Sequence, residues 1–145
     1  MSDLNSNRNC ATGEVRLRVR YAETDQMGVV YYSNFFVWFE IGRVELLRQL
    51  GFDYKTMEIE DDCFIPVVEA SCRYKSPARY DDELMISTHV IGVRGAVLKF
   101  RYRVVRISDQ QSLAEGETTH VVTDHTLTKR VLPEKYVCAL LAPSR

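Results

Sequence analysis

One acidic side chain, Asp25, lies in a short glycine-containing turn directly before a strongly apolar segment, YYSNFFVWFE. An aspartate in such a turn commonly accepts hydrogen bonds from its own backbone. The apolar segment has the composition of a buried helix, and the first N–H groups of a helix have no partner within it. Those N–H groups and the positive end of the helix dipole stabilise an anion, or an oxyanion that forms during a reaction. The sequence therefore leaves a turn-forming role and a catalytic role open for Asp25.

A carboxylate beside free N–H groups is sufficient for the hydrolysis of a thioester. The carbonyl of a thioester is weakly stabilised by resonance and its thiolate leaves readily, so neither a metal ion nor a nucleophilic serine is required. The chain has no G-x-S-x-G, H-E-x-x-H, G-x-G-x-x-G or G-x-x-x-x-G-K-[ST] motif. This argues against serine triads, zinc proteases, Rossmann sites and P-loops, and we expect no cofactor and no metal ion.

The three histidines, His89, His120 and His125, all fall within predicted strands. His120 and His125 are five residues apart, so a regular strand places them on opposite faces of a sheet. They cannot hold one metal ion together without a bulge. We interpret all three as packed or surface residues of strands.

Two segments that flank the turn have a clear pattern. Residues 15–21 alternate between apolar residues and arginines, as a half-buried strand does. Residues 33–50 contain no proline, have Ser33 or Asn34 to cap their start, and precede Gly51, which predicts one long helix. The first half of this helix is apolar on every side, and we expect it to be buried nearly all round.

The rest of the chain is dominated by strand patterns. A connecting segment at 53–62 is followed by strands at residues 63–76, 84–93, 96–107 and 113–126. Apolar residues change parity near residues 104–105, which predicts a β-bulge. Only a sheet that curls around it can cover such a helix, so we expect an α+β fold with a curled antiparallel sheet of about five strands wrapped around one long buried helix.

Length and composition limit the class of protein further. A chain of 145 residues with 46% hydrophobic residues suits one domain, and we expect a flexible arm over residues 1–12 and a single domain over residues 13–145. The net charge of −1 gives no reason to expect nucleic acid or an anionic membrane as a partner. Four cysteines without a C-x-x-C pair, no secretory signal and no membrane-spanning run favour a cytoplasmic protein.

Two stretches carry a family resemblance, YAETDQMGVVYYSNFFVWFEIGRVELLRQLG and FIPVVEASCRYKSPARYDDEL. They resemble the 4-hydroxybenzoyl-CoA thioesterase family and its YbgC-like acyl-CoA thioesterase branch. The resemblance implies the hot-dog fold and hydrolysis of a small-molecule acyl-CoA substrate. It matches Asp25 to the catalytic carboxylate, which acts as nucleophile or as general base for water. It matches Tyr32 to the position whose backbone N–H polarises the thioester carbonyl.

The resemblance also assigns the surroundings of these two groups. It implies that Gly28 belongs to the catalytic loop and that Val30, Tyr31 and Phe35 bind the substrate. Arg94, in the turn GVRGA, is the preferred contact for the phosphates of CoA. Weaker candidates for the phosphates are Arg73, Lys75 and Arg79.

Two differences from the family limit what the resemblance carries over. Many YbgC-like members have His where this chain has Tyr32, so only the backbone role transfers to this residue. The family often has Tyr where this chain has Phe35, so the substrate pocket lacks a hydroxyl group. This difference affects the acyl specificity that the resemblance implies more than the reaction that it implies. Outside these motifs, Glu40 is interpreted as an exposed or interface-facing residue of the helix.

The sequence leaves alternatives for the oligomeric state, the acyl carrier and the class of function. Similar hot-dog domains pair through edge strands and complete the active site across the interface, so we expect a homodimer or a homotetramer. An acyl carrier protein could replace CoA as the acyl carrier. A hot-dog hydratase is a second class, but it depends on a His near the helix, and residues 21–35 contain none. The third class of function, after thioester hydrolases and hydratases, is a non-catalytic module that binds acyl-CoA or RNA.

Overall fold

The structure is a computed structural model that describes residues 10–142. In this range the strands are Thr12–Arg18 (β1), Val67–Tyr74 (β2), Glu83–Arg94 (β3), Val97–Arg106 (β4) and Gln111–Val121 (β5). The helices are a 3-10 helix at Tyr21–Glu23 (η1) and α-helices at Asn34–Gln49 (α1), Tyr54–Glu60 (α2) and Glu134–Leu141 (α3).

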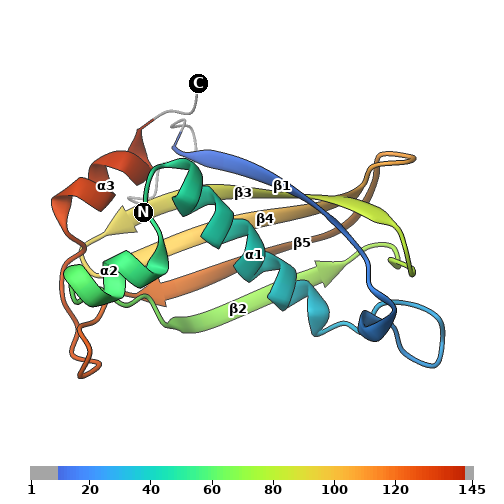
Figure 1. Ribbon diagram of the computed structural model, residues 1–145, viewed down its shortest axis with the longest axis horizontal. Helices are drawn as coiled ribbons and strands as arrows, with labels where there is room; N and C mark the ends of the chain where they lie inside the picture. The colour runs from blue at the N-terminus through green and yellow to red at the C-terminus, as the bar shows by residue number, and fades with distance from the viewer. Residues whose placement is uncertain (1–9, 143–145) are drawn as a thin grey trace.

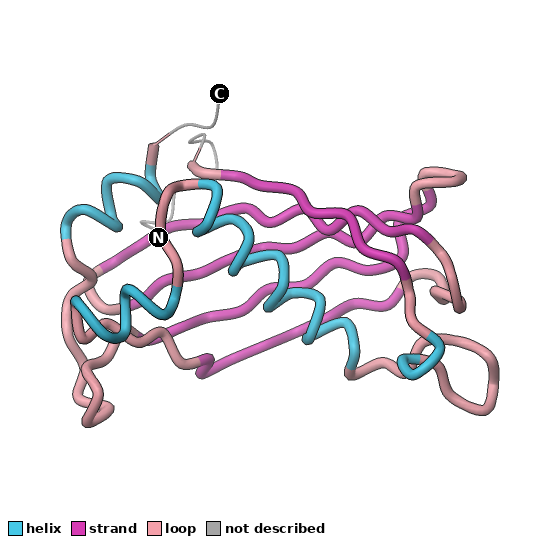
Figure 2. The backbone as a smooth tube through the Cα atoms, in the orientation of Figure 1, coloured by secondary structure: helices cyan, strands magenta, loops and turns pink. Residues whose placement is uncertain are grey.

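The strands form one five-stranded antiparallel sheet in the order β1-β3-β4-β5-β2, so β1 and β2 are its edges. Helix α1 lies obliquely across one face of the curled sheet (Figure 1). The loop that precedes α1 lies at one end of the sheet, and α2 and α3 lie at the other end (Figure 2). This arrangement confirms the predicted α+β fold with one long helix against a curled sheet.

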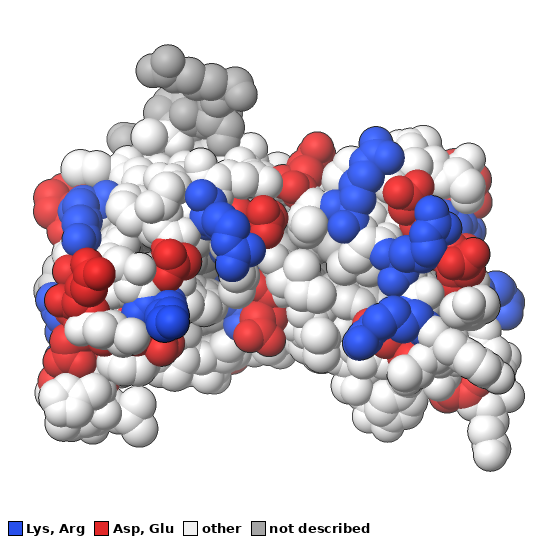
Figure 3. All heavy atoms as spheres, viewed as in Figure 1, with Lys and Arg blue, Asp and Glu red and all other residues white. Residues whose placement is uncertain are grey.

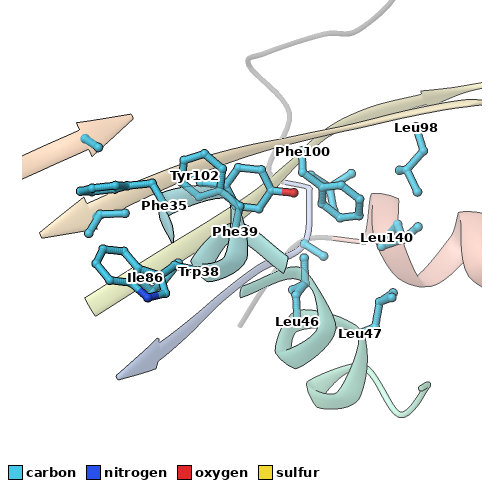
Figure 4. Packing of buried hydrophobic residues seen from close by; sticks show 14 of the residues in the cluster. Phe35, Trp38, Phe39, Leu46, Leu47, Ile86, Leu98, Phe100, Tyr102 and Leu140 are labelled. Atoms are coloured by element: carbon cyan, nitrogen blue, oxygen red, sulfur yellow. The ribbon is translucent and has the colours of Figure 1, made fainter. Parts of the chain in front are cut away.

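The side chains that α1 turns toward the sheet form the centre of the core. Trp38 and Phe39 are fully buried, and the Phe39 ring stacks on Tyr102 of β4 with ring centroids 4.4 Å apart (Figure 4). Gly42 permits close approach to β3, because a Cβ there would lie 2.4 Å from Thr88 Oγ1. A helix packed this closely is a rigid support for the loop at its start.

The expectation that α1 is buried nearly all round is wrong for one face. Val37 is 44% exposed and Ile41 is 39% exposed, and Glu40 between them is exposed as expected. The sheet covers the opposite face of the helix, so these residues have no covering element within residues 10–142. An apolar strip on an otherwise buried helix is the feature that a second subunit would cover.

The first strand begins and ends three residues earlier than the sequence predicts. β1 pairs with β3 from Thr12 opposite His89 to Arg18 opposite Glu83, while Tyr21 lies in η1 and is exposed. Of the expected arm at 1–12, residues 1–9 lie outside the described range. Cys10 and Ala11 are buried, so the packed structure already begins there.

Two helices and one turn also differ from the prediction. α2 lies within the expected connecting segment, and α3 lies in a stretch for which we predicted no helix. Asp53 caps α2, with its Oδ1 accepting from the Thr56 N–H at 2.8 Å. His125 lies in a turn after β5 and not in a strand. The predicted bulge is confirmed by the register shift between Val104 and Val105.

A chain of buried hydrogen bonds links α1 to the sheet. Arg43 Nη1 donates to the Tyr102 hydroxyl at 3.3 Å, and that hydroxyl lies 2.6 Å from the Thr118 hydroxyl. Thr118 Oγ1 lies 2.9 Å from His120 Nε2, and His120 Nδ1 lies 2.7 Å from the Ile65 carbonyl oxygen. Because a carbonyl only accepts, Nδ1 carries the proton and Nε2 accepts from Thr118. Burial lowers the pKa of His120 to about 4, so the ring is neutral at neutral pH.

The neutral His120 predicts a pH dependence of stability. Its pKa is lowered from 6.5 to about 4 on folding, so only the unfolded chain binds the extra proton between these values. The free energy of unfolding should therefore fall between pH 6.5 and pH 4, by about 3 kcal/mol in total. Urea denaturation of the wild type and of His120→Gln checks this, because the variant should lose that part of the pH dependence. If the free energy of unfolding changed equally with pH in both proteins, a neutral buried His120 would be contradicted.

Candidate active site

The Asp25 turn is a three-residue hairpin loop. Thr24 and Val30 form an antiparallel bridge at its base. The Asp25 N–H donates to the Val29 carbonyl and the Gly28 N–H donates to the Asp25 carbonyl, each at 2.9 Å. Gly28 has a φ of +81°, the left-handed conformation that closes such a loop and favours glycine. The local sequence therefore explains the shape of the loop.

The two carboxylate oxygens of Asp25 have different environments. Oδ1 accepts a hydrogen bond from the Met27 N–H at 2.8 Å, which confirms the turn-forming role. Oδ2 accepts no hydrogen bond from any residue between 10 and 142. The side chain is half-buried and lines a cavity. Asp25 is therefore held in place through one oxygen while the other is available.

The start of α1 offers the complementary donor. The N–H groups of Asn34, Phe35 and Phe36 donate to the carbonyl groups of residues 31, 32 and 33. The N–H of Tyr32 donates to no group in the part of the chain that the structure describes. Neither of the expected caps, Ser33 and Asn34, accepts a capping bond. Ser33 is the N-cap residue but its side chain makes no capping bond, and the Asn34 side chain donates to the Glu23 carbonyl. The residue just before the N-cap thus keeps an N–H without an acceptor in residues 10–142.

A cavity of about 360 Å³ lies between these two groups and is lined by both of them. Val30 and Phe35, two of the predicted substrate contacts, also line it. Tyr31 does not line the cavity, and its ring lies against Tyr32 with centroids 4.6 Å apart. Gly28 shapes the loop without lining the cavity.

One wall of the cavity was not expected from the sequence. The Tyr74 hydroxyl at the end of β2 donates to the Tyr32 carbonyl at 3.0 Å, and its ring meets Phe35 edge-on at 5.2 Å. Tyr74 therefore holds the start of α1 against β2. No local signal identifies it, since the contact joins residues 42 positions apart.

The structure does not bring Arg94 to this cavity within one chain. The Asp25 loop follows β1, whose Arg18 pairs with Glu83 at the start of β3. Arg94 ends β3, eleven steps along the strand from Glu83, which is a distance of roughly 36 Å. The cation that lines the cavity is Lys75, whose Nζ lies 3.0 Å from Glu115 Oε2.

Sequence reasoning also missed Glu23, two residues before Asp25. Its carboxylate is 5% exposed and accepts from Trp38 Nε1 at 3.0 Å.

Among residues 10–142 no group of three or more His, Cys, Asp or Glu side chains is placed to hold a metal ion. No helix in that range is long and apolar enough to cross a membrane.

Known proteins match both the sequence and the structure. The sequence profile of the thioesterase-like superfamily matches residues 19–141. The acyl-CoA thioester hydrolase YbgC of Escherichia coli O6:H1 is 35% identical over 122 residues, which are 83% of this chain and 90% of that protein. The hypothetical protein TT1821 of Thermus thermophilus has 37% identity and a TM-score of 0.82, covering 89% of this chain and 98% of that one. The DHNA-CoA thioesterase of Staphylococcus aureus has 27% identity and a TM-score of 0.79, covering 86% and 83%.

A sheet curled around one helix, with a carboxylate and an open N–H at the helix start, defines a hot-dog domain of the thioesterase class. The chain belongs to the thioesterase-like superfamily. This confirms the expected hot-dog fold and the expected class of enzyme. The individual roles of Asp25 and Tyr32 stay predictions.

The conformation of Gly28 generates a testable prediction. A valine at this φ is strained by about 1–3 kcal/mol, and the strain is purely conformational because nothing lies within 4 Å of a Cβ there. We expect Gly28→Val to lose most thiol release from acyl thioesters. Gly28→Asn is the matched control, because asparagine tolerates the left-handed region. Unchanged activity of the valine variant would show that the loop conformation does not matter.

Proposed function

We propose that the protein hydrolyses acyl-CoA thioesters at the cavity between Asp25 and Tyr32. One observation carries the proposal: Asp25 and Tyr32 line one cavity at the start of a buried helix, and within residues 10–142 neither Asp25 Oδ2 nor the Tyr32 N–H has a hydrogen-bond partner. The relatives named as thioester hydrolases support the reaction class. The apolar lining from Val30 and Phe35 suits the acyl group.

The thioester carbonyl would lie with its oxygen toward the Tyr32 N–H. In the tetrahedral state this oxygen carries the negative charge that the N–H and the helix dipole stabilise. Asp25 Oδ2 then acts in one of two ways. It either attacks the carbon and forms an anhydride that water hydrolyses, or it takes a proton from an attacking water. In both routes the C–S bond breaks, one water is consumed, and the carboxylic acid and the CoA thiol are released.

The central residue can be tested with an isosteric change. Asp25→Asn keeps the acceptor for Met27 N–H but removes the nucleophile or base, so thiol release should fall by about 10²-fold or more while the fold remains. A thiol-release assay over short, long, branched and aryl CoA esters measures it, with circular dichroism as the check on folding. Asp81→Asn is a control, because Asp81 is an exposed acid with a φ of 71° that asparagine tolerates. Wild-type turnover of Asp25→Asn would contradict the role of Asp25.

The other classes of function find less support. No histidine among residues 10–142 lines the cavity, which favours hydrolysis over the hydratase reaction. The strand arginines that suggested RNA binding are opposed by acids: Arg101 lies 3.0 Å from Glu117, and Arg103 lies 3.9 Å from Glu115. A surface of paired charges attracts the RNA backbone weakly.

We further propose that two copies pair through β2. This edge strand has exposed side chains along nearly its whole length, and no element within residues 10–142 covers the exposed strip of Val37 and Ile41 on α1. Figure 3 shows charged side chains over both halves of this face, with a narrow uncharged band between them. An unpaired edge strand with exposed apolar side chains such as Val67 and Val68 favours pairing with another strand.

Antiparallel pairing through β2 would also reverse the partner's sheet end for end. The partner's β3–β4 turn would then lie at the same end of the assembly as the Asp25 loop. We propose that the partner's Arg94 and the chain's own Lys75 contact the phosphates of CoA. Arg73 and Arg79 are exposed and do not line the cavity.

A charge placed in the strip tests this assembly. Val37→Lys should produce monomers, because the interface would bury the lysine ammonium. It should also raise KM for acyl-CoA, because a monomer has no contact between the CoA phosphates and the partner's Arg94. Sedimentation velocity and thiol-release kinetics measure the two effects. Val131→Lys is the control, since Val131 is exposed and lies beyond β5 in sequence, toward α3. A Val37→Lys protein with the wild-type oligomeric state would exclude this interface.

A further inference from the structure

Glu23 is the only acidic side chain that is buried among residues 10–142. Its Oε1 accepts from the Arg20 N–H at 2.8 Å. Its Oε2 accepts from Trp38 Nε1 at 3.0 Å and from Arg20 Nη2 at 3.3 Å. A buried carboxylate is tolerated only where donors satisfy it, and here three N–H groups converge on its two oxygens. The carboxylate therefore joins η1 to the buried face of α1.

The backbone carbonyl of Glu23 makes a second set of contacts. It accepts from the Tyr31 N–H at 2.9 Å and from Asn34 Nδ2 at 2.9 Å. Tyr31 immediately precedes Tyr32, and Asn34 is the first residue of α1. Glu23 itself lies two residues before Asp25. One residue thus contacts the segment that leads to Asp25, the segment that leads to Tyr32, and the helix at two points.

This arrangement has a consequence for the reaction. A carboxylate and an N–H act on the same carbonyl only if their relative position is fixed, and a misplacement of about 1 Å can cost 10²-fold in rate. A hairpin loop by itself is less precise than a helix or a strand. The bonds of Glu23 connect both ends of the loop to the core through Trp38.

We propose that Glu23 is a positioning residue that fixes Asp25 and the Tyr32 N–H relative to each other, an inference that rests on the proposed thioester hydrolysis. Glu23 does not line the cavity, so it acts through these groups and does not contact substrate. The role requires a carboxylate, because an amide has one accepting oxygen and would turn its NH₂ group toward one of the three donors.

The main variant is Glu23→Gln, which conserves shape and removes one acceptor. We expect kcat to fall by roughly 10- to 100-fold with KM within about threefold of the wild type. The residues that line the cavity remain, while the relative position of Asp25 and the Tyr32 N–H is no longer fixed. Trp38 is the only tryptophan of the chain, so its fluorescence reports the loss of the bond to its indole N–H directly. The emission maximum should shift in Glu23→Gln.

A second variant and a control keep the test decisive if Glu23→Gln folds poorly. Asn34→Ala removes only the bond to the Glu23 carbonyl, and it should lower kcat with an unchanged Trp38 hydrogen bond. Leu140→Val removes core volume in α3, at the far end of the sheet, so it lowers the melting temperature without changing kcat. Loss of kcat in Leu140→Val as well would show that general destabilisation explains the effect, which would overturn the proposal.

The outcomes separate this inference from the proposed function. A wild type that releases no thiol, or an Asp25→Asn variant as active as the wild type, would contradict the proposed function itself. Suppose instead that the wild type is active, Asp25→Asn is inactive, and folded Glu23→Gln and Asn34→Ala keep kcat within about twofold. Glu23 would then be a structural residue only, and the positioning role would be wrong.

Discussion

The structure depends on how the first turn of a buried helix satisfies its backbone N–H groups. Such groups have no helical acceptor, and a helix packed into a core needs other partners for them. Here Asn34, Phe35 and Phe36 find carbonyl acceptors three residues back. The Tyr32 N–H has no acceptor within residues 10–142, and Tyr32 and Asp25 line one cavity. A donor and a carboxylate oxygen that lack partners in the described part of the chain are thereby held beside an apolar space. This combination suits a carbonyl that must be polarised and attacked in the same place.

The remainder of the fold gives that arrangement its rigidity. Phe39 and Trp38 fix α1 against the sheet, and Trp38 also donates to the Glu23 carboxylate, so core packing and loop geometry share one side chain. Tyr74 also holds the helix start, through its hydrogen bond to the Tyr32 carbonyl. The exposed strip of α1 and the edge strand β2 are two surfaces that residues 10–142 leave uncovered. In the proposed function, catalysis and assembly would use neighbouring surfaces of one helix.

The sequence predicted what local chemistry determines and missed what depends on distant contacts. The Asp25 turn, the helix and the parity change in β4 follow from short stretches, and all are present. Glu23 looked like an ordinary acid because its burial depends on Trp38, fifteen positions later. Tyr74 was missed for the same reason. Arg94 was placed near the site by resemblance, but β3 carries it to the far end of the sheet, which only strand lengths and pairing reveal. The helix looked buried all round because periodicity does not show which face a single sheet covers.

The central claim is that the Tyr32 N–H polarises the thioester carbonyl, and carbonyl NMR tests it most directly. An acyl-CoA labelled with ¹³C at the thioester carbonyl would be bound to Asp25→Asn, which should hold it without turnover. We predict a clear downfield shift of the carbonyl resonance relative to free acyl-CoA, together with a change in the ¹⁵N shift of the Tyr32 amide. A saturated complex in which neither resonance moves would contradict the account, because the open N–H would then have no part in binding the substrate.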